Sequence, residues 1–375
     1  MENEMNEKAV TLFADEAVGS LELVAHFDGP MPTGVTVSER GRIFVNYPKW
    51  GDDVQFTVAE IRNGEAHAYP DQAFNDTDPD NPAAALVSVQ SVVVDPADRL
   101  WILDTGSPLF KPTVYGGPKL VCVDLNTDKV GACILFPQDV ALPTSYLNDV
   151  RFNLGQGAAG MAYITDSSEK GPNGIVVVDL ATGESWRRLH DHPSTKAETI
   201  REFMPVVEGR PFVRPGQDGA PELAAAMGAD GIAISADGTR LFYCPLASRR
   251  LYSVSTEALA DRARADEDVA ATVIDEGNKG GGSDGLESDA DGCIYATDYE
   301  HNAILRRRPG GLWETVVHDA RLLWPDTMSI AADGYLYVTA NQLHRQASYH
   351  DGQDLRRKPY ALFRVRIDAQ PVRLR

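Results

Sequence analysis

The sequence contains no run of about 18 apolar residues, the length that an α-helix needs to cross a bilayer. A membrane-spanning protein is therefore not expected. The first twenty residues, MENEMNEKAVTLFADEAVGS, are acidic and lack the basic segment and apolar core of a secretory signal. As written, the chain is predicted to be cytoplasmic, and it would be secreted or periplasmic only if it were a processed form.

Basic residues are scarce. The 375 residues include 35 Lys and Arg against 55 Asp and Glu, which gives a formal net charge of −20. Binding to nucleic acid or to an anionic membrane surface requires clustered positive charge, so neither partner is expected. The acidity is compatible with a bound cation. We expect a monomer whose partner is a small organic molecule.

Cysteine is also rare. The four cysteines, Cys122, Cys133, Cys244 and Cys293, are too few and too scattered for a disulfide framework or a zinc site, so we expect free thiols. One alternative stays open, because a turn centred on residues 127–128 would place Cys122 opposite Cys133 in a hairpin. The sequence also lacks a nucleophile elbow and a phosphate-binding loop, which argues against serine acyl transfer and nucleotide binding.

Helix signals are confined to three short stretches, at residues 195–203, 221–227 and 255–265. Elsewhere, short apolar or alternating runs end at Gly, Asp, Asn and Pro, which is typical of β-strands. These runs follow one template: a small or polar residue, four or five mostly apolar residues, a turn, and a second apolar run. The template occurs six times, and its polar positions are Thr33, Gln90, Asn148 with Asp149, Asp230, Asp284 and Asp326.

Six copies of a unit of about four strands predict an all-β fold, a six-bladed β-propeller of four-stranded blades. The N-terminal run LELVAHF can pair with YALFRVRI of the last blade and close the ring. We expect one domain over residues 1–375, with a flexible N-terminus at 1–18. The Pro- and Gly-rich stretch 192–228 is too long for a plain connection and is predicted to be a lid or rim insertion.

The repeat also predicts a site. In a hairpin, the start of the first strand and the end of the second lie at the same end. If the first strand of each blade is innermost, the polar positions meet at one mouth of the central channel, and the ends of the second strands surround them. From these two rings, the predicted ligand-binding residues are Thr33, Tyr47, Gln90, Asp104, Asp149, Asp326 and Asn341. The Asp-Gly steps at Asp237, Asp291 and Asp333 are predicted to be turns on the opposite face.

Carboxylates that converge on a channel repel one another. They must bind a cation, have raised pKa values, or accept hydrogen bonds from backbone N–H groups, and all three alternatives remain open. If a cation binds, oxygen ligands such as Asn148, Asp149, Asp230 and Asp284 suit Ca²⁺ or Mg²⁺ far better than zinc. No organic cofactor is indicated. His301 and His344 both follow second strands on the same face, so either could be a proton carrier, and Asp284 and His301 are the predicted catalytic residues.

Several segments resemble the Yellow / major royal jelly protein family: MPTGVTVSERGRIFVNYPKW, RLWILDTG, PKLVCVDLNTDKV, FPQDVALPTSYLNDVRFN with AYITDSS, and GIVVVDLATGESWRRL. The resemblance extends over about residues 20 to 370 and implies a six-bladed propeller. It also implies functions known in the family, namely binding of small amines or lipids in the central cavity, or conversion of dopachrome.

The chain is more distantly similar to the gluconolactonase / senescence-marker-protein propellers. That similarity implies a divalent cation held by Asn148, Asp230 and Asp284, with Asp284 also transferring a proton. In those propellers a glutamate of the first blade is a further ligand. Its position falls here at Pro32 and Thr33, neither of which has a carboxylate.

Two classes of function follow. The first is a divalent-cation-dependent lactone hydrolase, in which the cation polarises the carbonyl and Asp284 is the general base. The second is a non-enzymatic protein that binds a small ligand in the same cavity, with Tyr47, Trp50 and Tyr299 packing against it. A dopachrome-type isomerase is a third alternative that rests only on the resemblance.

Overall fold

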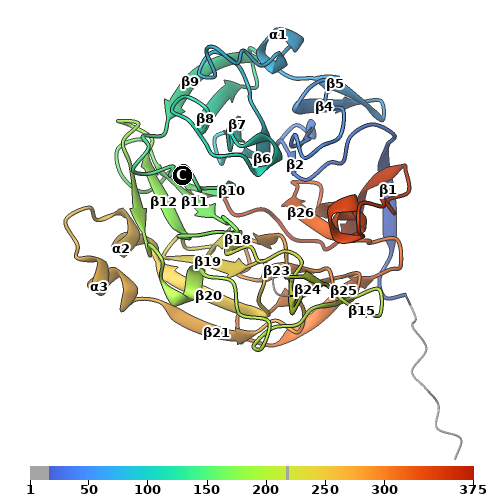
Figure 1. The fold of residues 1–375 in the computed structure, drawn as a ribbon. Coiled ribbons are helices and arrows are strands. Elements are labelled where there is room, and N and C mark those ends of the chain that lie inside the picture. Colours follow the sequence, from blue (N-terminus) through green and yellow to red (C-terminus); the bar gives the residue numbers. More distant parts are fainter. Residues whose placement is uncertain (1–16, 217–218) are drawn as a thin grey trace, which may run out of the picture.

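The computed structural model describes residues 17–216 and 219–375. Six four-stranded antiparallel sheets are arranged around a central channel, which confirms the predicted all-β, six-bladed propeller (Figure 1). In each sheet the first strand of the repeat is innermost, and these inner strands contact one another around the ring. The polar positions of the six repeats therefore face the channel.

The strands of each blade are given from the channel outwards. The first blade contains β2 (Val35–Val37), β3 (Ile43–Asn46), β4 (Val58–Arg62) and β5 (Glu65–Ala68). The second contains β6 (Val89–Val94), β7 (Arg99–Asp104), β8 (Lys119–Asp124) and β9 (Lys129–Leu135). The third contains β10 (Leu147–Asn153), β11 (Met161–Asp166), β12 (Gly174–Asp179) and β13 (Ser185–Arg188).

The other three blades follow the same order. The fourth contains β18 (Ala229–Ile234), β19 (Arg240–Pro245), β20 (Arg250–Ser255) and β21 (Ile274–Asn278). The fifth contains β22 (Leu286–Ser288), β23 (Ile294–Asp298), β24 (Ala303–Arg307) and β25 (Trp313–His318). The sixth contains β26 (Pro325–Ile330), β27 (Tyr335–Ala340), β28 (Tyr360–Arg366) and β1 (Leu21–Phe27).

The sixth blade closes the ring as predicted. Its outermost strand, β1, comes from the N-terminal part of the chain and pairs antiparallel with β28, from Leu21 opposite Val365 to Phe27 opposite Tyr360. The flexible segment predicted at 1–18 lies outside the described residues except for its last two positions. Of these, Val18 already forms an isolated β-bridge with His318.

The hydrophobic core lies between neighbouring blades. Strands near the channel are covered on both faces, so they are near-continuous apolar runs such as SVVV in β6. Trp101 of the second blade, for example, stacks on Phe152 of the third with ring centroids 5.2 Å apart. Because each blade needs two neighbours to bury its faces, the closed ring is the stable unit.

Two of the three predicted helices are wrong. Residues 195–203 contain only the end of a 3₁₀ turn (Pro193–Thr195), and residues 221–227 begin with strand β17 (Pro221–Leu223). The third is interrupted: α2 (Thr256–Ala260) stops at Asp261, whose carboxylate accepts from Ala263 N at 3.0 Å, and α3 (Asp266–Ala270) begins later.

The remaining short helices lie in loops. They are α1 (Gln72–Asn75) and the 3₁₀ turns η1 (Pro108–Phe110), η3 (Leu343–Arg345) and η4 (Ala347–Tyr349). In the part of the chain that the structure describes, no helix is long and apolar enough to span a membrane.

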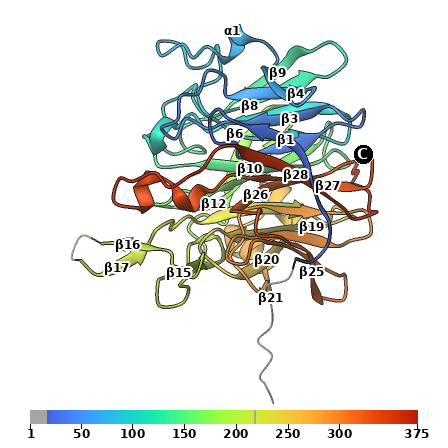
Figure 2. The same cartoon turned by 90° about the vertical axis from the view of Figure 1, so that its right-hand side faces the viewer.

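The predicted insertion at 192–228 contains two small hairpins, β14 (Val206–Val207) with β15 (Arg210–Pro211), and β16 (Val213–Pro215) with β17. Its side chains Phe203, Phe212 and Leu223 are buried in the same cluster as Trp324. Figure 2 shows β15 to β17 on one side of the propeller and the C-terminal end on the other. We call the side with these hairpins the insertion face.

The opposite end of the channel is crossed by residues 369–375, the C-terminal strap. Leu374 O accepts from Leu154 N at 3.0 Å, and Arg375 Nε donates to Pro96 O at 2.7 Å. A cavity of about 100 Å³ beneath the strap is lined by Arg151 and Glu287. The predicted Asp-Gly turns are confirmed at the hairpin ends, where Gly238, Gly292 and Gly334 have positive φ angles.

The alternative pairing of Cys122 with Cys133 is wrong by one residue. A bulge between Cys122 and Val123 shifts the register, so Cys133 lies opposite Val121 and Cys122 opposite Ala132. Successive side chains of a strand point to opposite faces, which separates the two thiols. All four cysteines are free, as expected.

Candidate functional site

The polar ring at the insertion face is shaped by β-bulges. In four of the six inner strands the register shifts at the polar position of the repeat. A bulge turns the local side chain out of the regular alternation, here toward the channel. The shifts lie between Val89 and Ser91, Leu147 and Val150, Ala229 and Ile232, and Pro325 and Met328.

Threonines of the second strands support the starts of the inner strands, whether bulged or not. Thr297 Oγ1 accepts from the backbone N–H groups of both Asp284 and Gly285 at 3.0 Å, and Thr165 Oγ1 donates to Asp230 O at 2.6 Å. Thr339 Oγ1 donates to Thr33 O at 2.5 Å and thereby links the last blade to the first. Backbone groups that lie outside the regular ladder of hydrogen bonds are satisfied in this way.

Two glycines let the inner strands approach closely. A Cβ atom on Gly231 would lie 2.6 Å from Asp284 O, and one on Gly285 would lie 2.3 Å from Asp326 O. Each glycine directly follows a ring aspartate. The Asp-Gly steps at Asp230 and Asp284 therefore differ from the turn Asp-Gly steps, because they bring carboxyl groups of adjacent blades together.

Three carboxyl groups form the centre of the site, and we call Asp230, Asp284 and Asp326 the carboxyl triad. All three are buried, with exposed fractions of 4%, 8% and 3%. Asn148 Nδ2 contacts Asp230, and Asn341 Nδ2 donates to Asp326 at 2.7 Å. Within residues 17–216 and 219–375, no basic side chain forms an ion pair with the triad, so its charge is not balanced by the protein.

The pKa values of the triad are raised. Burial raises the pKa of Asp284 to about 6, although hydrogen bonds with Trp324 and Asp230 act in the opposite direction. Burial, followed by the charge of Asp284, also raises the pKa of Asp230 and Asp326 well above the ordinary range. At neutral pH the triad therefore holds protons that isolated aspartates would have lost.

Asp284→Asn is expected to stabilise the protein at neutral pH. The folded pKa of about 6 exceeds the ordinary 3.8, so between these values the folded chain retains a proton that the unfolded chain releases. The contribution of Asp284 to the free energy of unfolding therefore falls as the pH rises from about 4 to 6, and it stays low above pH 6. The variant should be more stable than wild type by on the order of 2 kcal/mol above pH 7, and by little at pH 4.

Urea unfolding in the presence of EDTA from about pH 4 to 8 measures this difference. Asp291→Asn, at an exposed turn position, is the matched control and should change stability little at any pH in this range. A gain in stability at Asp284→Asn that does not grow with pH would contradict the assigned pKa.

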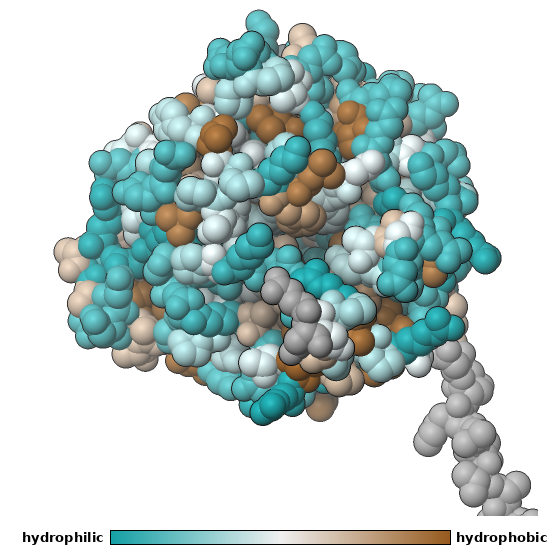
Figure 3. Space-filling model, viewed as in Figure 1, coloured by the Kyte–Doolittle hydropathy of each residue, from teal (hydrophilic) through white to brown (hydrophobic). Residues whose placement is uncertain are grey.

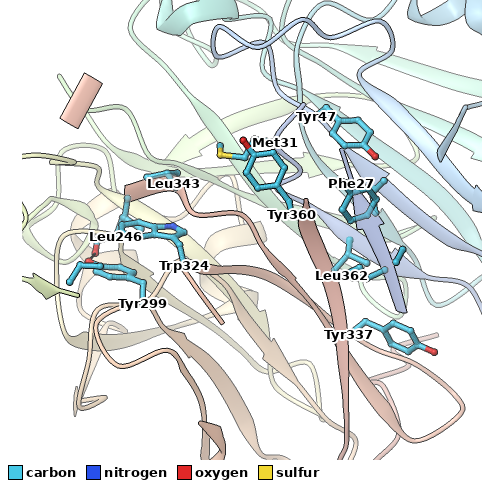
Figure 4. Packing of buried hydrophobic residues seen from close by; sticks show 14 of the residues in the cluster. Phe27, Met31, Tyr47, Leu246, Tyr299, Trp324, Tyr337, Leu343, Tyr360 and Leu362 are labelled. Carbon is cyan, nitrogen blue, oxygen red and sulfur yellow. Dashed lines mark hydrogen bonds between the residues drawn. The ribbon is translucent and has the colours of Figure 1, made fainter. Parts of the chain in front are cut away.

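One wall of the site is an aromatic stack beside Asp284. Trp324 Nε1 donates to Asp284 Oδ2 at 2.6 Å, and its ring lies 4.2 Å from the Tyr299 ring at an interplanar angle of 8° (Figure 4). On the other side it stacks against His344 at 5.7 Å. Trp324 has a φ of 57°, a left-handed conformation that is unfavourable for a bulky residue and is held here by this packing.

A second aromatic wall belongs to the first three blades. Trp50 stacks on Phe110 with centroids 5.3 Å apart, and its Nε1 donates to Tyr146 OH at 2.7 Å. Tyr146 in turn donates to Gln90 Oε1 at 2.9 Å. Figure 3 looks onto the insertion face, where hydrophobic side chains lie beside a hollow near the centre.

The structure assembles most of the predicted site residues in one ring. Asp149 is part of it but is neutralised, since Arg151 Nη1 lies 2.9 Å from Asp149 Oδ2 and Ser91 Oγ donates to the other oxygen. The inner strands bring seven predicted positions to the ring: Thr33, Gln90, Asn148, Asp149, Asp230, Asp284 and Asp326. Asn341, which was also predicted, donates to Asp326.

Three predicted residues lie elsewhere. Tyr47 is in the core against Phe27, apart from Trp324 in Figure 4. Asp104 is fully buried and paired with Lys119 at 2.8 Å, and it also accepts three backbone N–H bonds. The ring of His301 bonds Asp298 at 2.8 Å, which raises its pKa, and it lines a separate lateral groove with Lys279.

Trp324 and Tyr146 were not predicted from the sequence. Both stand two residues before a polar position of the repeat, Asp326 and Asn148 respectively. An aromatic residue at that position of the template was the signal that could have found them. Arg151, which neutralises Asp149, was also missed, because a basic residue inside an apolar strand gives no indication of its partner.

The fit of the site to a divalent cation is incomplete. Asn148, Asp230 and Asp284 are neighbours and carry the oxygen atoms that Ca²⁺ prefers. However, among the residues that the structure describes, no group of three or more acidic, His or Cys side chains is arranged to hold a metal ion. In the first blade, Thr33 instead donates to Gln90 O and accepts from Asn46.

These features define a six-bladed β-propeller with a polar site at one mouth of its channel. Residues 87–371 match the sequence profile of the major royal jelly protein family. The chain belongs to this family, which confirms the resemblance seen in its motifs. It is 27% identical over 267 residues to Protein yellow of Drosophila melanogaster, an alignment that covers 68% of this chain and 46% of that protein. The chain thus spans about half the length of such curated relatives.

Solved structures share the fold. A calcium-binding protein, regucalcin, of Agrobacterium tumefaciens has 15% identity and a TM-score of 0.54, with 93% of this chain and 95% of that chain covered. A gluconolactonase of Xanthomonas campestris has 12% identity and a TM-score of 0.52, with 95% and 98% covered. At these identities the likeness is one of fold alone, the six-bladed propeller architecture.

Proposed function

We propose that the protein binds a small organic molecule carrying a protonated amine at the insertion-face mouth. The observation that supports this is the carboxyl triad, three neighbouring buried acids without a basic partner in the described chain. A cation placed among them would replace the shared protons and offset their repulsion. A divalent metal ion needs a full set of ligands, which this site does not provide in the described chain. An ammonium group does not need such a set.

The two aromatic walls suit the rest of such a molecule. Trp324 with Tyr299 stands beside Asp284, and Trp50 with Tyr146 stands beside Gln90. Trp324, which is buried between Tyr299 and His344, acts through its hydrogen bond to Asp284. The partly exposed Trp50 and the exposed Phe110 can pack against a planar ring or a cation, and Gln90 can orient a polar substituent. A small aromatic or aliphatic amine is therefore the ligand class that the site favours.

Titration calorimetry with phenethylamine, and with neutral 2-phenylethanol for comparison, tests this proposal. The amine should bind and the alcohol should not, and Asp284→Asn should weaken amine binding by about tenfold or more. Affinity should rise from pH 5 to pH 7, because Asp284, whose pKa is about 6, becomes charged over that range. Asp237→Asn should have no effect. Equal affinity for the amine and the alcohol would reject the proposal.

A second candidate, hydrolysis of a lactone, is favoured by the same pKa of Asp284. A carboxyl group with a pKa of about 6 is largely ionised at neutral pH and can take a proton from an attacking water. Because the metal fit is incomplete, no step is assigned to a cation. Release of acid from glucono-δ-lactone, with and without added CaCl₂, distinguishes the candidates. Turnover that is lost in Asp284→Asn supports hydrolysis, and turnover stimulated by CaCl₂ would restore the divalent-cation proposal.

A further inference from the structure

A second cavity opens on the insertion face outside the channel, and we call it the rim cavity. It has a volume of about 760 Å³ and lies between the insertion, at residues 207–213, and the loop at residues 344–357. This volume is in the range of pockets that enclose a small organic ligand. None of the carboxyl triad lines the cavity, so it is a separate place on the molecule.

Aromatic side chains form its apolar part. Phe212 of the insertion packs edge-on against Tyr349 of the loop, with centroids 4.9 Å apart. Phe212 also contacts Trp324 at 5.5 Å, and Trp324 stands between the rim cavity and Asp284. An aromatic or other planar body could rest against Phe212 and Tyr349 without entering the channel.

The acidic side chains of the rim cavity are already paired. Glu208 accepts from Arg345 and bonds His344 Nε2 at 2.8 Å. Asp354 pairs with Arg356 at 2.8 Å. Their negative charge is thus compensated within the protein and is not available to a ligand.

Two arginines of the rim cavity have no such partner. Arg210 from the insertion and Arg357 from the loop line the cavity, and in the described chain neither guanidinium forms an ion pair or a hydrogen bond. The protein as a whole has a net charge of −20, so two unpaired cations at one cavity stand out. A guanidinium group presents paired N–H donors that match a carboxylate or a phosphate.

We propose that the rim cavity binds a small organic anion with an aromatic body, whose acidic group is held by Arg210 and Arg357 and whose ring packs on Phe212 and Tyr349. This ligand class is opposite in charge to the one proposed for the channel. Because the residues that would hold the two ligands differ, either proposal can fail without the other.

Binding of 1-naphthylacetate, followed by naphthalene fluorescence or calorimetry, tests the rim cavity. The double variant Arg210→Gln/Arg357→Gln should weaken binding by about tenfold or more, since each arginine contributes charged hydrogen bonds. Arg40→Gln, another exposed arginine without an ion pair in the described chain, should leave affinity unchanged.

Three results would overturn this assignment. The first is a double variant that binds 1-naphthylacetate with wild-type affinity, and the second is a wild-type protein that shows no saturable binding at millimolar concentration. The third is an Asp284→Asn variant that binds 1-naphthylmethylamine as tightly as 1-naphthylacetate, which would show that the rim cavity does not select negative charge. Unchanged thermal unfolding of the two glutamine substitutions establishes that any loss of affinity is local.

Discussion

Removal of residues 1–28 should prevent the protein from folding into a stable ring. The deletion takes away β1, and with it the backbone partners of β28 and the buried side chains Leu21 and Phe27. The sixth blade would keep three strands and expose the edge of β28, a surface that pairs readily with other chains. We expect loss of the cooperative thermal transition and aggregation during expression.

The matched control begins at Ala17 and retains β1. This control should unfold as the full-length protein does. A synthetic peptide of residues 17–30 added during refolding should restore part of the soluble, cooperatively unfolding protein. A deletion variant that melts like the control would show that the closure contributes little.

Lys119→Met should be the most destabilising single substitution considered for this protein. Lys119 and Asp104 are both fully buried, and Lys119 Nζ lies 2.8 Å from Asp104 Oδ2. Removing the lysine leaves a buried carboxylate without its counter-ion, a change that costs about 3–5 kcal/mol. Urea unfolding of the variant measures the loss.

Lys129→Met on the exposed strand β9 is the control, and it should change stability by less than about 0.5 kcal/mol. The double variant Lys119→Met/Asp104→Asn should recover part of the loss, because it no longer buries an unpaired charge. A Lys119→Met protein as stable as the control would mean that the three backbone N–H donors satisfy Asp104 on their own.

The architecture was predictable from the sequence because the repeat is local. Each inner strand, its turn and the second strand are encoded within about twenty consecutive residues, and pairing of β1 with β28 follows once six such units are counted. The helices at 195–203 and 221–227 were mispredicted for the opposite reason. Those residues lie in an insertion whose conformation is decided by packing on the insertion face, which overrides local propensity.

The site was predictable in part. Asp230, Asp284 and Asp326 occupy equivalent positions of the template, so their convergence followed from the repeat itself. Asp104 also follows a strand on the same face, but its partner Lys119 lies on the next strand, and only the folded structure shows that this pair is internal. The role of Trp324 depends on its left-handed backbone and on contacts with two other segments, which no local pattern encodes.

The C-terminal strap has a kinetic consequence for any molecule that binds the carboxyl triad. By tying Leu154, Pro96 and Ala290 together, it covers the end of the channel opposite the insertion face. We therefore expect arrival and departure to use the opening on the insertion face, so that one occupant leaves before another enters. Exchange at this site should be limited by the rate at which that single entrance clears, whatever the affinity of the incoming molecule.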